Sequence, residues 1–419
     1  GAFGMARVVL GFYPGFLVAC FELLEYIFYV SATVQFAAAF VQDKLHINDT
    51  YEPIVCLVFY VLFAVLLFDG NQVYWRFNAV MGVGCFLILV IFCFGSLAYT
   101  DLPHNASLRR NSENNSALIN WFSGGLPYFL QALPFATWGF GGIECAALVT
   151  DMVENSRKTT SKGMVYGVVT LFVLVIFVMF VACSSFDHGL NEYREVEFLL
   201  NPGFMKMGMS YHDAQWMIIP AQIASSFGFL IPASKLIQSM SHSQLIPQNI
   251  ALNLPSCCAS KLWSLVLSYC VFLIAFYYNP FDLVNIPILF SMITYLSDLY
   301  AYYRLQTDLN SAAEKEFVSP FGVAGALFAG IIFTACLLAV CIYDFAALIV
   351  VVGITIVLSI YYFTYAKHEQ KFSEQEQKTL LNFHVIQTNR RRRLKRPVAH
   401  VTHFAFHVPR MTSAPITPI

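Results

Sequence analysis

Charged residues are scarce in this sequence. Only 24 Lys and Arg and 25 Asp and Glu occur among 419 residues, which is 12% of the chain. A typical soluble domain carries about 25%. Because 58% of the residues are hydrophobic, the chain lacks the ionic surface that a protein in water needs. The composition excludes an ordinary soluble domain and predicts an all-α polytopic membrane protein.

Metal-binding and disulfide patterns are also missing. Eleven cysteines are scattered, mostly inside apolar stretches, without a Cys-x-x-Cys pair or a Cys/His spacing typical of zinc sites. No nucleophile with a nearby base is evident. We therefore expect no metal, no cofactor, no nucleic-acid partner and no enzymatic activity.

Apolar windows long enough to cross a bilayer recur about ten times. They divide the chain into a transmembrane domain over residues 1–366 and a polar tail over 367–419. The windows lie near residues 14–41, 52–69, 77–99, 125–150, 164–184, 213–234, 262–279, 283–303, 320–341 and 344–366.

Basic residues indicate the orientation, because they accumulate on the cytoplasmic side. With the N-terminus inside, only five of the 24 Lys and Arg fall outside. The Asn-x-Ser/Thr sequons at Asn48, Asn105 and Asn114 also fall in loops assigned outside, so these residues are candidate glycosylation sites. We expect a multi-pass protein, most simply of the plasma membrane.

The tail contains one strong basic cluster over residues 389–396. A functional interpretation is contact with anionic lipids of the inner leaflet, where each basic side chain contributes about 1 kcal/mol. The alternative is a solvated tail that merely obeys the charge rule.

The fourth window has the most unusual sequence. Pro134, Gly139, Gly141, Gly142 and a carboxylate lie within about three helical turns. Proline removes a backbone donor and glycine lowers the cost of leaving helical geometry. Broken backbone at membrane depth is tolerated only against protein or a watery cavity, and it indicates a transport site. The alternative is a kinked structural helix with a satisfied glutamate.

Carboxylates inside the windows are candidate functional groups, because such residues are costly in a membrane. Glu22 and Glu25 lie three apart on one helical face, and Glu144 follows the proline- and glycine-rich stretch. Both members of the first pair cannot ionise cheaply unless a cation, such as a substrate ammonium, joins them. Alternatively, tyrosine or backbone donors satisfy them. Asp298 fits better as a structural partner of Arg304.

Two hydroxyls, those of Ser225 and Ser226, fall near mid-membrane in the sixth window and are candidate cavity groups. Serine often bonds its own helix carbonyl instead, so this signal is weak.

Several segments together are similar to one known family. They are Asn120-Trp121-Phe122, residues 132–136 with Trp138, Phe140, Ile143 and Glu144, then Glu25-Tyr26-Ile27-Phe28, residues 234–247, and residues 303–305 through 319–322. They resemble amino acid–polyamine–organocation (APC) permeases, nearest the ethanolamine permease type. The similarity runs over about residues 1–366.

The resemblance implies a twelve-helix, LeuT-like fold with an inverted repeat of five plus five helices, broken at helices one and six. The first window here corresponds to the family's third helix, so residues 1–366 match helices 3–12 and helices one and two are expected to be missing. No intramembrane lysine of the kind that replaces sodium in some members is evident. The family also suggests a homodimer.

Carried over from the family, residues 135–141 are the expected substrate wall. The expected substrate-binding residues are Glu25, Tyr29, Phe135, Ala136, Thr137, Trp138, Gly139 and Phe140. Trp138 matches an aromatic gate, while Glu144 and Glu22 are the expected coupling or structural acids.

The leading hypothesis is a secondary transporter of a small amine-bearing solute, working by alternating access and possible proton coupling. The alternative is a nutrient sensor that does not transport, or a truncated inactive relic.

Overall fold

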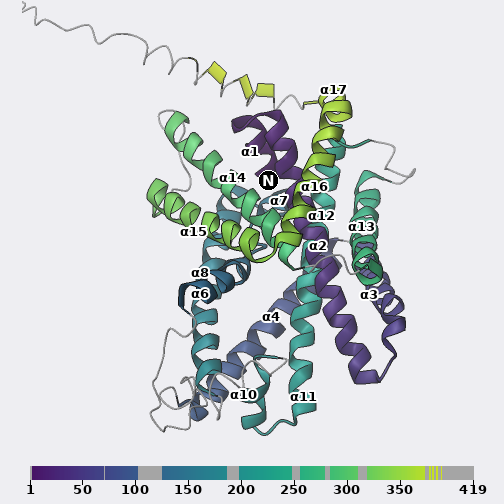
Figure 1. Ribbon diagram of the computed structural model, residues 1–419, viewed down its shortest axis with the longest axis vertical. Coiled ribbons are helices and arrows are strands. Elements are labelled where there is room, and N and C mark those ends of the chain that lie inside the picture. The colour runs from purple at the N-terminus through teal and green to yellow at the C-terminus, as the bar shows by residue number, and fades with distance from the viewer. Residues whose placement is uncertain are drawn as a thin grey trace, which may run out of the picture.

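The computed structural model describes residues 2–69, 71–101, 125–185, 198–247, 255–278, 284–309, 319–372 and isolated positions between 377 and 388. Within these ranges the protein is helical and contains no strand (Figure 1). Each of the ten predicted windows contains a helix. Eight helices in the described part are long and apolar enough to cross a membrane. The all-α polytopic fold is therefore confirmed.

The helices follow one another along the chain without any strand between them in the described ranges. Up to residue 185 they are α1 (Ala2–Val9), α2 (Phe12–Leu45), α3 (Glu52–Phe68), α4 (Asn71–Ser96), α6 (Gly125–Trp138), α7 (Cys145–Leu148) and α8 (Ser156–Ser184). After residue 198 they are α10 (Asn201–Lys206), α11 (Tyr211–Gln215), α12 (Ile219–His242), α13 (Ser256–Tyr278), α14 (Asn285–Leu309), α15 (Gly322–Tyr343), α16 (Phe345–Tyr361) and α17 (Lys367–Glu369). A π-helical turn, Tyr362–Ala366, joins the last two.

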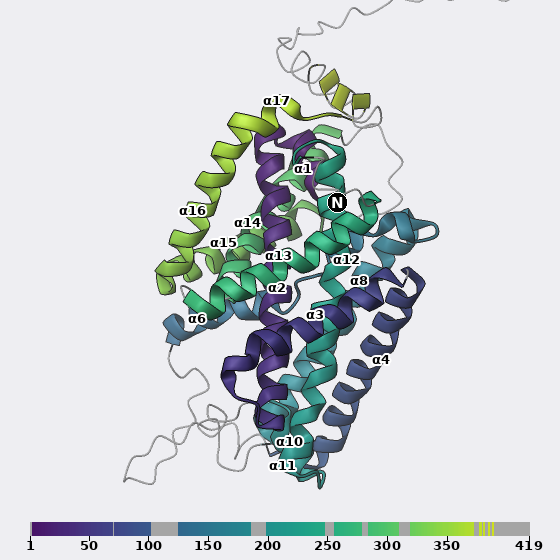
Figure 2. The same cartoon turned by 90° about the vertical axis from the view of Figure 1, so that its right-hand side faces the viewer.

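Helix α2 is the central helix, or axis, of the bundle. Its 34 residues span about 51 Å, more than the roughly 30 Å of a bilayer core. Its most apolar window is 72% buried, whereas the other seven spanning helices reach 11–44%. It runs through the middle of the bundle in Figure 2 and packs against α12, α13 and α14. Side chains on α2 are therefore screened from lipid on most sides.

Two hydrophobic clusters flank this axis. One joins α2 to α3, α12 and α13, and the other joins it to α14, α15 and α16. A third cluster links α4, α8 and α10 away from the axis. Many large apolar side chains on α3, α4, α8, α15 and α16 stay exposed. In a bilayer such a surface meets lipid, which is as apolar as the side chains themselves.

Helix α12 extends further than the sequence suggested. The predicted span ended near residue 234, but the helix continues to His242 and includes Pro232 in its interior. Leu236, Ile237 and Met240 are buried in this last part. Their contacts compensate for the bond lost at the proline, so the polar Lys235 does not end the helix.

Candidate functional site

The fourth crossing is discontinuous. Helix α6 ends at Trp138 and α7 begins at Cys145, so residues 139–144 form turns between two helices. This confirms the predicted break. Its position differs from the expected wall over 135–141, because Pro134 lies buried inside α6. Thr137 donates its hydroxyl to the carbonyls of Leu133 (3.1 Å) and Pro134 (2.9 Å). The helix continues through the proline and ends where the glycines begin.

Glycine geometry maintains this break. Gly142 has φ +93°, a left-handed conformation that favours glycine. Its amide donates to both carboxylate oxygens of Glu144, each at 3.0 Å. A Cβ at position 142 would lie 2.8 Å from Cζ of Phe229 on α12. Glu144 thus receives local hydrogen bonds, as the structural alternative required, yet it does so within a broken segment.

The paired glutamates of α2 are buried beside this break. Glu22 is 1% exposed and Glu25 is 2% exposed. Oε1 of Glu22 accepts from the Tyr26 hydroxyl at 3.1 Å, and Oε1 of Glu25 accepts from the Tyr295 hydroxyl at 3.5 Å. The other oxygen of each glutamate has no hydrogen-bond partner among the described groups. Each carboxyl group therefore keeps one acceptor available for a further donor.

Helix α14 completes the cluster of acids. Tyr295 bonds Glu25, and its hydroxyl would also lie 3.4 Å from a Cβ placed on Gly141 in the break. Asp298, one turn further along α14, interacts electrostatically with Glu144. Carboxyl groups from α2, the break and α14 thus lie near one another, and no ion pair between described residues involves them.

An aromatic wall borders the cluster. Tyr29 contacts Trp138 edge-on, with ring centroids 4.9 Å apart, and packs against Phe229 at 4.3 Å. Tyr26 contacts the same phenylalanine at 5.3 Å. Trp138, at the last position of α6, therefore lies between helix α2 and the turns of residues 139–144. Tyr26, whose hydroxyl donates to Glu22, links these aromatic rings to the buried glutamates.

The other predicted wall residues lie in different surroundings. Phe135 is 46% exposed on α6, and Ala136 and Gly139 are exposed as well. Phe140 is half-buried, and the Thr137 hydroxyl lies 3.4 Å from the Cys336 sulfur on α15. The structure therefore brings Glu22, Glu25, Tyr29, Trp138 and Glu144 together.

The two serines of α12 bond within the protein. Ser225 donates to the Gln222 carbonyl at 3.0 Å, as the alternative interpretation expected. Ser226 donates to the same carbonyl and contacts the Thr33 hydroxyl on α2 at 2.8 Å. Their role as cavity groups stays a prediction.

Of the three sequons, Asn48 is exposed between α2 and α3. Its Oδ1 accepts from the amide and hydroxyl of Thr50. Asn105 and Asn114 lie outside the described residues. Glycosylation at all three stays a prediction.

Two residues of this region were not identified from the sequence. Tyr295 lies one turn before Asp298, a helical spacing that offered a signal. Phe229 is one of 40 phenylalanines and offered none. Among the described residues, no group of three or more His, Cys, Asp or Glu side chains is arranged to hold a metal ion.

Fold and site together define a polytopic helical membrane protein with one discontinuous crossing beside buried acids. The family model of the amino acid permeases matches residues 5–378, so the chain belongs to the amino acid permease family. This confirms the resemblance to APC permeases and the class of function, a membrane transporter. A search among curated proteins finds no match for this chain.

Proposed function

We propose that this permease moves a small solute carrying an ammonium group, such as an amino acid, ethanolamine or a polyamine, by alternating access. The observation that carries the proposal is the pair of buried glutamates on α2, each with one oxygen lacking a described partner. A buried carboxylate is costly unless a cation or a proton accompanies it. A substrate ammonium provides both charge and hydrogen-bond donors.

The broken segment supports the same proposal. Residues 139–144 form turns in which the amides of 139–142 are bonded locally, and the remaining backbone groups of these turns can contact a solute in a hydrated space. Trp138, held edge-on against Tyr29, is suited to cover the solute. Coupling to a proton gradient through Glu22, Glu25 or Glu144 is part of the proposal, because three neighbouring buried acids do not all ionise cheaply.

Uptake of radiolabelled amines and amino acids by cells expressing the full-length protein tests the proposal. Glu25→Gln keeps the shape of the side chain but removes the charge that the ammonium needs, so uptake is expected to fall at least about tenfold, the effect of roughly 1.4 kcal/mol. The matched control is Glu154→Gln, which removes one negative charge at an exposed position. Trp138→Ala is expected to lower uptake as well.

Three outcomes would each contradict one part of this proposal. Unchanged uptake in Glu25→Gln would remove that residue from the site. Solute-induced stabilisation of the purified protein without flux into vesicles would indicate a sensor. Uptake that survives collapse of the proton gradient by a protonophore would remove proton coupling, while leaving the solute class intact.

A further inference from the structure

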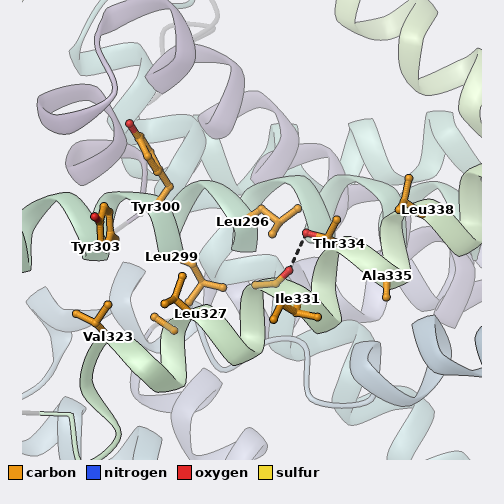
Figure 3. Close-up of a pocket in the computed structure, with 12 residues that line it drawn as sticks. Leu296, Leu299, Tyr300, Tyr303, Val323, Leu327, Ile331, Thr334, Ala335 and Leu338 are labelled. Atoms are coloured by element: carbon orange, nitrogen blue, oxygen red, sulfur yellow. Dashed lines mark hydrogen bonds between the residues drawn. The ribbon is translucent and has the colours of Figure 1, made fainter.

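A groove of about 640 Å³ lies on the outside of the bundle between α14 and α15. Figure 3 shows side chains of both helices bordering it, with tyrosines at one end and Leu338 at the other. Leu327 and Ile331 border it and are 61% and 70% exposed. The volume falls within the range of about 300–1,000 Å³ typical of small-molecule sites. The groove therefore has the size of a binding site and opens on the apolar surface of the molecule.

Small residues of α15 create the hollow. Ala326, Gly330 and Ala335 line the groove, where larger side chains would fill it. A Cβ on Gly330 would have its nearest heavy atom, Leu299 Cδ1, at 3.9 Å. Thr334 donates its hydroxyl to the Gly330 carbonyl at 2.7 Å, the bond drawn in Figure 3, so its polar group is already occupied. The middle of the groove is accordingly apolar.

One end of the groove is polar and cationic. Tyr300 and Tyr303 border it and are 50% and 41% exposed. Arg304, the next residue of α14, donates from Nη1 to the Tyr300 hydroxyl at 3.4 Å. In the orientation indicated by the basic residues, this end faces the cytoplasm. Tyrosine and arginine are the side chains that meet headgroups at a membrane interface.

The groove is long enough to hold one lipid chain. Val323 and Leu338, which border it on α15, are 15 residues apart, so the groove follows that helix for about 22 Å. Half of a bilayer core measures about 15 Å. An acyl chain that starts at the cytoplasmic interface can therefore lie within the groove along its whole length.

We propose that this groove binds a phospholipid of the cytoplasmic leaflet, with an acyl chain along Leu299 and Ile331 and an anionic headgroup beside Tyr303 and Arg304. The apolar middle excludes a polar solute, and the Arg304 guanidinium beside the mouth favours an anionic headgroup over a neutral one. Tyr295, one turn before Leu299 on α14, bonds Glu25 on α2 and packs against Phe333 of α15, so the two helices that border the groove also support the candidate transport site. The proposal stands independently of the transported solute.

Photolabelling tests the proposal. The full-length protein is reconstituted in phosphatidylcholine vesicles containing a trace of phosphatidylserine or phosphatidylcholine with a diazirine on the acyl chain. Labelled peptides are identified by mass spectrometry. Labelling is expected to concentrate on Leu299, Ile331 and Thr334, and to be stronger with phosphatidylserine.

Two matched pairs of variants separate a site from general lipid contact. Gly330→Leu fills the groove and is expected to abolish labelling there, whereas Gly353→Leu, on the exposed face of α16, leaves it unchanged. Arg304→Gln is expected to reduce the preference for phosphatidylserine about fivefold, the effect of one basic side chain at the membrane surface. Arg76→Gln, on an exposed part of α4, leaves the preference unchanged.

Either of two results would overturn the proposal. Equal labelling of α4, α8, α16 and the groove would mean ordinary bilayer contact. Disulfide-linked dimers formed by Ile331→Cys, but not by the wild-type chain, would assign the groove to a second copy of the protein.

Discussion

Two buried tyrosines differ in what their hydroxyl groups contact. Tyr26 on α2 donates to Glu22 at 3.1 Å. Tyr60 on α3 is equally hidden, at 4% exposure, but its hydroxyl has no hydrogen-bond partner among the described groups. Burial of a polar group without a hydrogen bond destabilises the folded state, whereas a hydrogen bond offsets the desolvation cost of both the donor and the acceptor. The two positions therefore predict opposite responses to the loss of a hydroxyl.

Tyr26→Phe is expected to destabilise the protein by about 1–3 kcal/mol, because Glu22 loses the donor to its Oε1 and is left with two unmet oxygens. Tyr60→Phe is the matched control and is expected to be neutral or slightly stabilising. Denaturant titration in micelles gives the free energy of unfolding. An equal loss in both variants would show that the Glu22 hydrogen bond does not matter for stability.

Among secondary-structure elements, the interruption between α6 and α7 depends on where each glycine lies. Gly142 adopts φ +93° and has Phe229 against it. Gly139 lies in the same interruption, but a Cβ there would only make ordinary contacts, the shortest 3.5 Å to the Ala136 carbonyl oxygen. One glycine is required by geometry, while the other is replaceable.

Gly142→Ala is expected to lower the free energy of unfolding by about 1–3 kcal/mol, since a Cβ is strained at positive φ and would overlap the phenylalanine ring. Gly139→Ala is expected to leave stability within about 0.5 kcal/mol. Thermal unfolding of both variants in the same detergent measures the difference, and uptake assays follow its effect on transport. A stable Gly142→Ala protein would mean that the break tolerates an ordinary backbone.

At the scale of the whole molecule, α1 meets the segment that follows α17. Arg7 on α1 is 1% exposed, and its guanidinium lies 4.3 Å from the ring of Phe372. It also donates to the Gln370 side chain at 3.3 Å and the Lys371 carbonyl at 3.5 Å. The Lys371 amide in turn donates to Ser243, just after α12. This contact joins α1, the C-terminal end of α12 and the segment after α17; α1 and α17 lie together at the top of the bundle in Figure 1.

A double-mutant cycle measures this contact. Arg7→Ala and Phe372→Ala are each expected to destabilise the protein, and the double variant is expected to lose about 0.5–2 kcal/mol less than the sum, because the two side chains contact each other. Arg76→Ala, exposed on α4, with Phe372→Ala is the control and should be additive. Additivity in the Arg7 cycle would mean that α1 and the segment after α17 are not energetically coupled.

Much of the fold was predictable because hydropathy in a membrane protein is a local property of the sequence. The windows of α2, α3, α8 and α16 are read directly from apolar runs. Helix ends were less predictable, since α12 continues past Lys235 through contacts that only neighbouring helices provide. Its length depends on packing, which a single window of sequence does not contain.

Some residues of the candidate site were likewise predictable from the sequence, and others were not. Glu22, Glu25 and Glu144 stood out because carboxylates are rare in apolar segments. Tyr295 and Phe229 did not, because aromatic residues are common throughout this chain. Their importance comes from their positions in the folded protein. Tyr295 on α14 bonds Glu25 on α2, and Phe229 on α12 packs against the turn at Gly142.

The amino-acid sequence by itself determined that this protein is helical, spans a membrane and interrupts its fourth crossing, since apolar length, proline and glycine act through the local backbone. Only the tertiary structure decided which acids lie near one another, which aromatic rings pack beside them and where the surface is hollow. These features join residues far apart in the chain, and the packing of whole helices around α2 sets their distances.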